Sequence, residues 1–156
     1  MERIKIDKDY LVPVKSNFDG TLIFNAENYE EFWYKIGDVL MLPWDEIQDI
    51  RKYKRSFFQR NWIMFEDTKE YTADNFYSAL GVSEYYPKGN SFKNFDDVIS
   101  MKPKEIATYL QDMNNDYIEA FTGYAKRLYE TGDSRMDSKT KVNAIEKVLN
   151  VNFNEV

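Results

Sequence analysis

The sequence contains no cysteine and no histidine, and each absence excludes a class of chemistry. Without cysteine there can be no disulfide, no thiolate nucleophile and no cysteine-ligated metal site. Without histidine the chain lacks the usual general base, the Ser-His-Asp triad and the side chain on which most zinc sites depend. A pair of catalytic carboxyl groups, or a carboxylate site for Mg²⁺ or Ca²⁺, is still compatible with this composition.

Long apolar runs are absent as well. No stretch approaches the roughly 20 apolar residues that span a bilayer, and residues 1–16 are charged throughout, unlike a secretory signal. We therefore expect synthesis in a cytoplasm and no membrane partner. The formal net charge of −6 argues against nucleic acid as a partner, because that binding depends on neutralising phosphates with Lys and Arg.

The carboxylates do not form a recognisable catalytic pattern. Glu66-Asp67 and Asp96-Asp97 are neighbours in sequence, whereas a glycosidase pair needs two carboxyl groups facing each other across a cleft. The segment that starts at Asp112 begins like a Ca²⁺ loop, but Tyr117 and Gly123 occupy the positions that require Gly and Glu. The sequence therefore predicts no catalytic, cofactor-binding or metal-binding residue, and a function that is not enzymatic.

The N-terminal part of the chain shows the alternating pattern of β-strands. Asp19-Gly20 lies between two apolar runs, and this pair predicts a tight hairpin that joins them. Strands are expected at residues 11–14, 21–24, 31–36 and 39–42.

A helical pattern follows the strands. Pro43 marks the start of an amphipathic helix that runs to about residue 60, with Ile47, Ile50 and Phe57 as its buried stripe. The apolar segment 62–65 is too short for a helix and is expected to be a buried strand. From Thr72, a good N-cap, the rest of the chain reads as short helices.

Together these patterns predict an α+β protein. An N-terminal antiparallel β-meander packs on one long helix and is followed by an all-helical C-terminal lobe. The expected lobes are residues 1–70 and 71–156, sharing one continuous core.

Aromatic residues are abundant, with 12 Tyr, 11 Phe and 3 Trp. Because Tyr and Trp are favoured in the cores of interfaces, the aromatics expected on hairpin faces and loops are candidates for partner contacts. The alternative is that they cover the seam between helices and sheet. The basic run 51–60 is a second candidate, although the acidic net charge favours a solvated helix face that complements the macrodipole. The partner-contact candidates are Tyr29, Trp33, Tyr85, Tyr86, Arg51, Lys52 and Arg55.

Three segments carry a resemblance to a known family. These are LVPVKSNFDGTLIF at residues 11–24, GDVLMLPWDEIQDI with a following helix and RNWIMF, and NFDDVISMKPKEIATYLQDM leading into helical pairs. Their order resembles that of small virion-associated proteins of tailed bacteriophages, over roughly residues 11–150. This chain departs from the family in its longer aromatic third strand and in lacking a double Gly before RNWIMF.

The resemblance implies a structural or assembly protein of the phage head, neck or tail. Such a protein is synthesised in the cytoplasm of the host bacterium, is located in the virion, and binds other virion proteins or further copies of itself. The alternative is a phage-encoded inhibitor or regulator that binds a host protein. The motifs are structural, so they imply architecture more directly than role.

Overall fold

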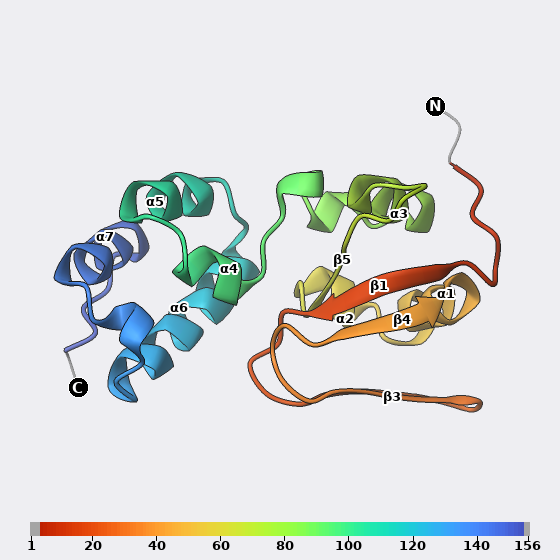
Figure 1. The fold of residues 1–156 in the computed structure, drawn as a ribbon, viewed down its shortest axis with the longest axis horizontal. Helices are drawn as coiled ribbons and strands as arrows, with labels where there is room; N and C mark the ends of the chain where they lie inside the picture. The colour runs from red at the N-terminus through yellow and green to blue at the C-terminus, as the bar shows by residue number, and fades with distance from the viewer. Residues whose placement is uncertain (1–3, 155–156) are drawn as a thin grey trace. The chain divides into compact units, whose positions relative to one another are not determined.

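The computed structural model describes residues 4–154, and the chain divides into two units between Asn94 and Phe95 (Figure 1). All the strands of the described chain lie in the first unit, and the second unit is helical. The predicted α+β class, with antiparallel strands first and helices after them, is confirmed.

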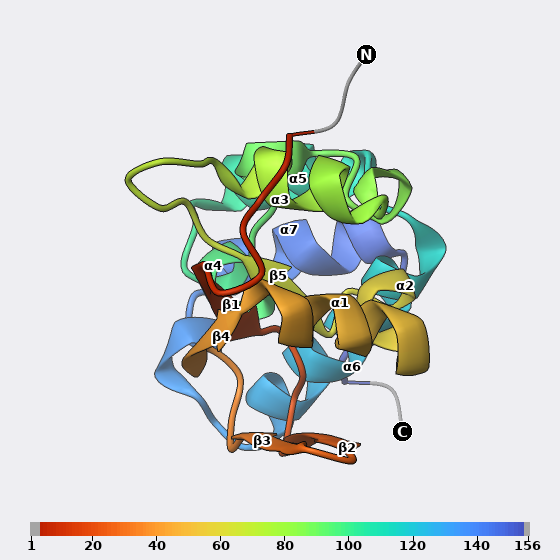
Figure 2. The same cartoon turned by 90° about the vertical axis from the view of Figure 1, so that its right-hand side faces the viewer.

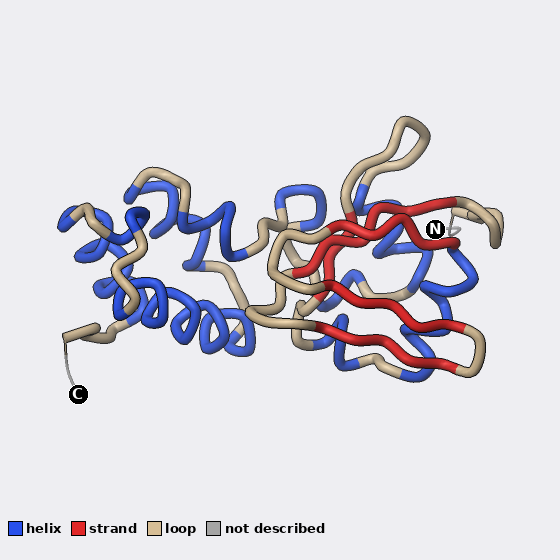
Figure 3. The backbone as a smooth tube through the Cα atoms, turned by 60° about the horizontal axis from the view of Figure 1, so that its bottom comes forward, coloured by secondary structure: helices blue, strands red, loops and turns tan. Residues whose placement is uncertain are grey.

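The strands form two separate antiparallel sheets (Figure 3). In the three-stranded sheet, β1 (Leu11–Ser16) lies between β4 (Val39–Pro43) and β5 (Ile63–Phe65). The second sheet is a two-stranded ribbon of β2 (Leu22–Ala26) and β3 (Tyr29–Trp33). The strand order is therefore not sequential, because the first strand occupies the centre of its sheet.

The predicted hairpin between the first two strands is wrong. Both edges of β1 are occupied, by β4 and β5, so β2 has no edge of β1 to pair with. Gly20 has a φ of +128°, and Asp19 is not among the positive-φ residues, so this pair does not form the turn with two positive φ values that a tight hairpin needs. The ribbon instead reaches β1 through the indole Nε1 of Trp33, which donates a hydrogen bond to the Val14 carbonyl at 3.0 Å.

The helix predicted from Pro43 to about residue 60 is two helices, α1 (Trp44–Tyr53) and α2 (Ser56–Gln59). A continuous helix would place Lys54 on the buried stripe between Ile50 and Phe57. The backbone leaves the helical conformation at Lys54, where φ is −137° and ψ is 54°, and the ammonium group stays exposed. Burying an unpaired charge costs more than ending a helix, which explains the break.

The next helix belongs to the first unit, so the unit boundary lies later than the predicted 70/71. Helix α3 (Ala73–Leu80) begins with the predicted Thr72 cap, whose side chain accepts a hydrogen bond from the Asn75 amide. It packs against β5: the Phe65 amide donates to the Tyr77 hydroxyl at 3.1 Å. Figure 2 shows α3 and the ribbon at opposite ends of this unit, with the three-stranded sheet and α1 between them. The unit ends with two short 3-10 turns, η1 (Ser83–Tyr85) and η2 (Gly89–Ser91).

The second unit is built from helices around one aromatic cluster. Its elements are α4 (Phe95–Ile99), α5 (Pro103–Gln111), α6 (Asn115–Glu130), the 3-10 turn η3 (Ser134–Met136) and α7 (Lys139–Leu149). The Phe95 ring lies 5.0 Å from Tyr117 and 5.8 Å from Phe121, between ring centres. The side chains of Asn114 and Ser138 cap α6 and α7, since each accepts a hydrogen bond from a backbone amide at the start of its helix.

Candidate functional site

Exposed apolar side chains gather on the outer face of the three-stranded sheet. Leu11 is 52%, Val39 42% and Met41 53% exposed. The pairing of β1 with β4 puts these three side chains on one face, because Leu11 pairs with Pro43, and Met41 and Val39 are two and four residues from Pro43. We call Leu11, Val39 and Met41 the sheet patch. The opposite face carries the buried Val12, Val14 and Leu42.

The outer face of the ribbon is apolar and aromatic as well. Ile23 pairs with Phe32 across the ribbon, and the Phe32 ring stacks on Tyr34 with ring centres 5.9 Å apart. Ile23 is 44% and Tyr34 70% exposed. We call Ile23, Phe32 and Tyr34 the ribbon patch. With the sheet patch it contributes five of the strongly exposed large hydrophobic residues, and the other two in residues 4–154, Ile4 and Tyr53, also lie in the first unit.

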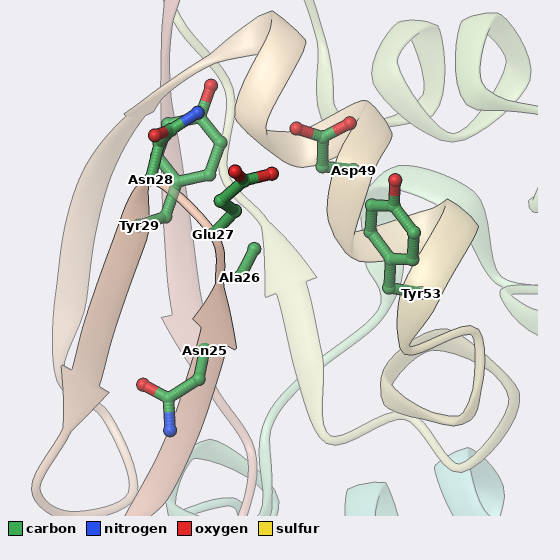
Figure 4. Close-up of a pocket in the computed structure, with 7 residues that line it drawn as sticks. All are labelled: Asn25, Ala26, Glu27, Asn28, Tyr29, Asp49 and Tyr53. Carbon is green, nitrogen blue, oxygen red and sulfur yellow. The ribbon is translucent and has the colours of Figure 1, made fainter.

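A pocket of about 430 Å³ lies between the β2–β3 turn and α1 (Figure 4). Its walls include two tyrosines, Tyr29 and Tyr53, and two carboxylates, Glu27 and Asp49. Figure 4 shows the Glu27 side chain extending from the turn toward the helix that carries Asp49 and Tyr53. The remaining lining residues are Asn25, Ala26 and Asn28, so the lining contains hydrogen-bond acceptors and rings but no basic side chain. This chemistry suits a hydrogen-bond donor or a cation.

A buried carboxyl pair joins the ribbon to α1. Glu46 is only 2% exposed, and within the described chain its Oε1 atom has no hydrogen-bond partner. Glu31 on β3 is the neighbouring carboxylate that acts most strongly on the pKa of this group, through its charge and through hydrogen bonding. Glu46 does not line the pocket, so the pair is a feature of the packing between ribbon and helix.

The environment of this pair favours the protonated form of Glu46. Burial is the largest cause that raises the pKa of Glu46. The charge of Glu31, hydrogen bonding to Glu31 and the charges of Asp45 and Asp49 raise it further, to about 7 in total. The same side of α1 affects Tyr29, whose pKa is raised by partial desolvation and then by Asp45, Asp49 and Glu46. The surface between ribbon and α1 is therefore strongly acidic.

Two of the aromatic partner-contact candidates are buried and cannot contact a partner. Trp33 is 0% exposed and bonded to β1, so it belongs to the core. Tyr86 is 2% exposed, stacks on Tyr77 with ring centres 4.0 Å apart, and donates a hydrogen bond from its hydroxyl to the Ile63 carbonyl at 2.5 Å. For these two residues the alternative holds, because they fill the interior of the first unit.

The other candidates lie at or near the surface, in separate places. Tyr29 lines the pocket, whereas Tyr85 is half-buried beside Arg55. The Arg55 Nε donates to the Tyr85 hydroxyl at 3.2 Å, and its guanidinium lies 3.9 Å from the Glu84 carboxylate. The hydrogen bond to Tyr85 is the largest of the interactions that raise the pKa of Arg55. Arg51 and Lys52 lie in the last turn of α1, as the macrodipole favours.

In the second unit the carboxylates that the sequence singled out are structural. Asp96 pairs with Arg135 at 2.9 Å and accepts a hydrogen bond from Tyr124, and Arg135 also bonds Asp133 at 3.0 Å. The bonds from Arg135 lower the pKa of Asp133 to about 2. This cluster connects α4, α6 and η3.

The Glu31–Glu46 pair was missed by the sequence analysis, although a signal for it exists. Glu31 is two residues before Trp33, and Glu46 is four residues before Ile50. The strand and helix periods therefore place both carboxyl groups on faces that the structure buries. A carboxylate that has the same strand or helix spacing as the buried apolar residues should be predicted to be buried with them.

The described residues lack two further features, a cluster that could hold a metal ion and a helix that could cross a membrane. No group of three or more His, Cys, Asp or Glu side chains between residues 4 and 154 is placed to hold a metal ion. Over the same residues no helix has the length and hydropathy needed to cross a bilayer.

Comparison with known proteins leaves the family prediction untested. The chain matched no family model, no curated protein and no solved structure. The resemblance to tailed-phage virion proteins accordingly stays a prediction that rests on the three sequence segments.

Proposed function

We propose that this chain is a non-enzymatic structural or assembly protein of a tailed-phage virion that acts by binding other virion proteins. The sheet patch is the observation that supports a binding role most directly. Leu11, Val39 and Met41 project from one face of a regular sheet, next to an ordered core. Exposed apolar side chains gathered on one face are typical of surfaces that a partner covers.

The distribution of exposed apolar residues supports the first unit as the site of this contact. Within residues 4–154, the large hydrophobic side chains with strong exposure all lie between Ile4 and Tyr53. The helical unit offers none of this kind in the described chain. We therefore propose that the sheet patch and the ribbon patch form the main contact surface with other virion proteins.

Quantitative mass spectrometry of purified particles tests whether the chain is a virion component. A virion component is expected in a fixed copy number per particle, retained through salt washing and gradient purification. Absence from the particles, together with one stoichiometric host protein recovered on the chain in infected cells, would instead establish the alternative, an inhibitor or regulator of a host protein.

The substitution Met41→Lys tests whether the sheet patch contacts other virion proteins in the particle. Because Met41 is 53% exposed, the substitution should change the free energy of unfolding by no more than about 0.5 kcal/mol. It should nevertheless lower incorporation into particles at least tenfold, since it buries a charge in the interface. Ala120→Lys, an exposed position on α6 with the same change in charge, is the control. Equal incorporation of the two variants contradicts the assignment.

A further inference from the structure

The second unit carries a groove on the surface of its helix pair α5 and α7. The groove has a volume of about 480 Å³. On α5 it is lined along one face from Pro103 to Gln111, and on α7 from Thr140 to Val148. The lining residues recur at intervals of three or four, as residues on one face of a helix do. They are Pro103, Lys104, Ala107 and Gln111 on α5 and Thr140, Ala144, Lys147 and Val148 on α7.

The groove has an apolar floor because its central residues are short. Ala107 and Ala144 are half-buried, as are Pro103 and Val148 near the ends. The larger apolar residues of the same helices, such as Ile106 and Ile145, are fully buried in the unit. Two alanines at the centre leave a depression into which the side chains of another helix can pack, as ridges pack into grooves.

The rim of the groove is positively charged, in contrast to the chain as a whole. Its only ionisable lining residues are Lys104 and Lys147, whereas the chain carries a net charge of −6. Neither ammonium group has an ion pair or hydrogen bond within residues 4–154. The neighbouring Glu146 does not line the groove, and its carboxylate accepts a hydrogen bond from the Phe153 amide at 2.9 Å.

The two lysines lie at opposite ends of the groove. Lys141 on α7 donates a hydrogen bond to the Ile99 carbonyl at 2.8 Å, which places the beginning of α7 beside the beginning of α5. Lys104 is in the first turn of α5, and Lys147 is in the last turn of α7. The floor from Pro103 to Gln111 covers eight residue steps, or about 12 Å at 1.5 Å per residue.

We propose that this groove binds an amphipathic helix of a partner protein that carries Asp or Glu on both sides of its apolar face. Two turns of such a helix match the floor, and acidic residues about two turns apart reach Lys104 and Lys147 together. A fatty acid also combines an apolar chain with a carboxylate, but its one head group can neutralise only one end. The proposal rests on the proposed protein-binding function and adds a second contact, in the helical unit.

A selection experiment on the full chain tests the groove without knowledge of the partner. The bait is the intact protein, and the probe is a displayed library of 16-residue amphipathic helices with randomised apolar and charged positions. Enriched peptides should carry acidic residues on both sides of the apolar face. Their binding to the variant K104E/K147E should weaken at least tenfold in low salt, and charge-reversed peptides carrying Lys should bind that variant more tightly than the parent chain.

The control variant is K102E/K139E. It makes the same change in charge at exposed residues at the beginnings of α5 and α7, outside the groove lining. Binding should be retained in it within about threefold. Three results would overturn the proposal: no enriched peptide, enrichment without acidic residues, or equal weakening in both variants. Displacement of the selected peptides by laurate, with equal laurate affinity for a chain lacking only one of the two lysines, would identify an alkyl carboxylate as the ligand instead.

This result is independent of the particle experiment. A chain found in particles whose groove fails the selection keeps its proposed function and loses only this second contact. A chain absent from particles whose groove binds acidic helices would retain the groove and lose the virion assignment.

Discussion

Replacing Glu46 with glutamine should stabilise the protein by about 3 kcal/mol at pH 8 and change its stability little at pH 4.5. Glu46 is 2% exposed, and burial followed by the influence of Glu31 raises the pKa of its carboxyl group from 4.5 to about 7. Between these pH values the folded chain binds more protons at this site than the unfolded chain, so stability falls as the pH rises. The stabilising contribution is complete below pH 4.5 and is lost by about pH 7, and each pH unit corresponds to about 1.4 kcal/mol.

Glutamine removes this dependence because it has nearly the shape of glutamic acid and no proton to lose. Its amide can donate a hydrogen bond to the Glu31 carboxylate at any pH. Urea unfolding at a series of pH values between 4 and 8 measures the difference. Glu30→Gln, on β3 next to Glu31 but exposed, is the control and should follow the parent curve within about 0.5 kcal/mol. Parallel curves for Glu46→Gln and the parent protein would show that the carboxyl pair does not titrate in this range.

The helices and strands could be predicted from sequence where local and tertiary preferences agree. Thr72 and Gly81 bound α3 as their capping chemistry predicts, and the apolar segment at Ile63–Phe65 is a buried strand. Pro103 starts α5 for the same reason, since its fixed φ suits the first helical turn. In each case the local signal agrees with the type and position of the element that forms.

The pairing of the strands could not be predicted, because the core determines it at long range. Asp19-Gly20 is a strong local hairpin signal, yet β1 exchanges its hydrogen bonds with β4 and β5. Pairing β1 with β2 would displace β4 or β5 from its edge of β1. The position of the unit boundary has a similar cause: α3 begins the helical pattern, but its aromatic face packs on Phe65 of a strand.

The candidate contact residues show that a high aromatic content does not indicate which aromatic side chains are exposed. Tyr85 and Tyr86 are adjacent, and only Tyr85 is within reach of the surface. Tyr86 is buried because its ring stacks on Tyr77 of α3. The sheet patch was missed for the opposite reason, since Val39 and Met41 lie in an apolar run that suggests a fully buried strand.

Replacing Trp33 with alanine should destabilise the first unit by about 3–5 kcal/mol, the largest single effect we expect for the ribbon. The indole is 0% exposed and fills the space between the ribbon and the three-stranded sheet. Its Nε1 supplies the hydrogen bond to the Val14 carbonyl, at 3.0 Å. Alanine removes the ring, leaves a cavity beside Leu22, its pairing partner, and leaves the carbonyl without that donor.

Trp33→Phe separates packing from hydrogen bonding, because it keeps an aromatic ring and loses only the donor and part of the volume. Its expected cost is about 1–3 kcal/mol. Hydrogen exchange should show where the loss acts: in Trp33→Ala the amides of β2 and β3 should exchange much faster, since the indole is the bonded link from ribbon to β1. Tyr34→Ala, next in sequence but 70% exposed, is the control and should leave ribbon exchange unchanged. If Trp33→Ala costs less than about 1 kcal/mol, the ribbon is held in the unit by its remaining contacts, such as the packing of Phe24 against Phe57.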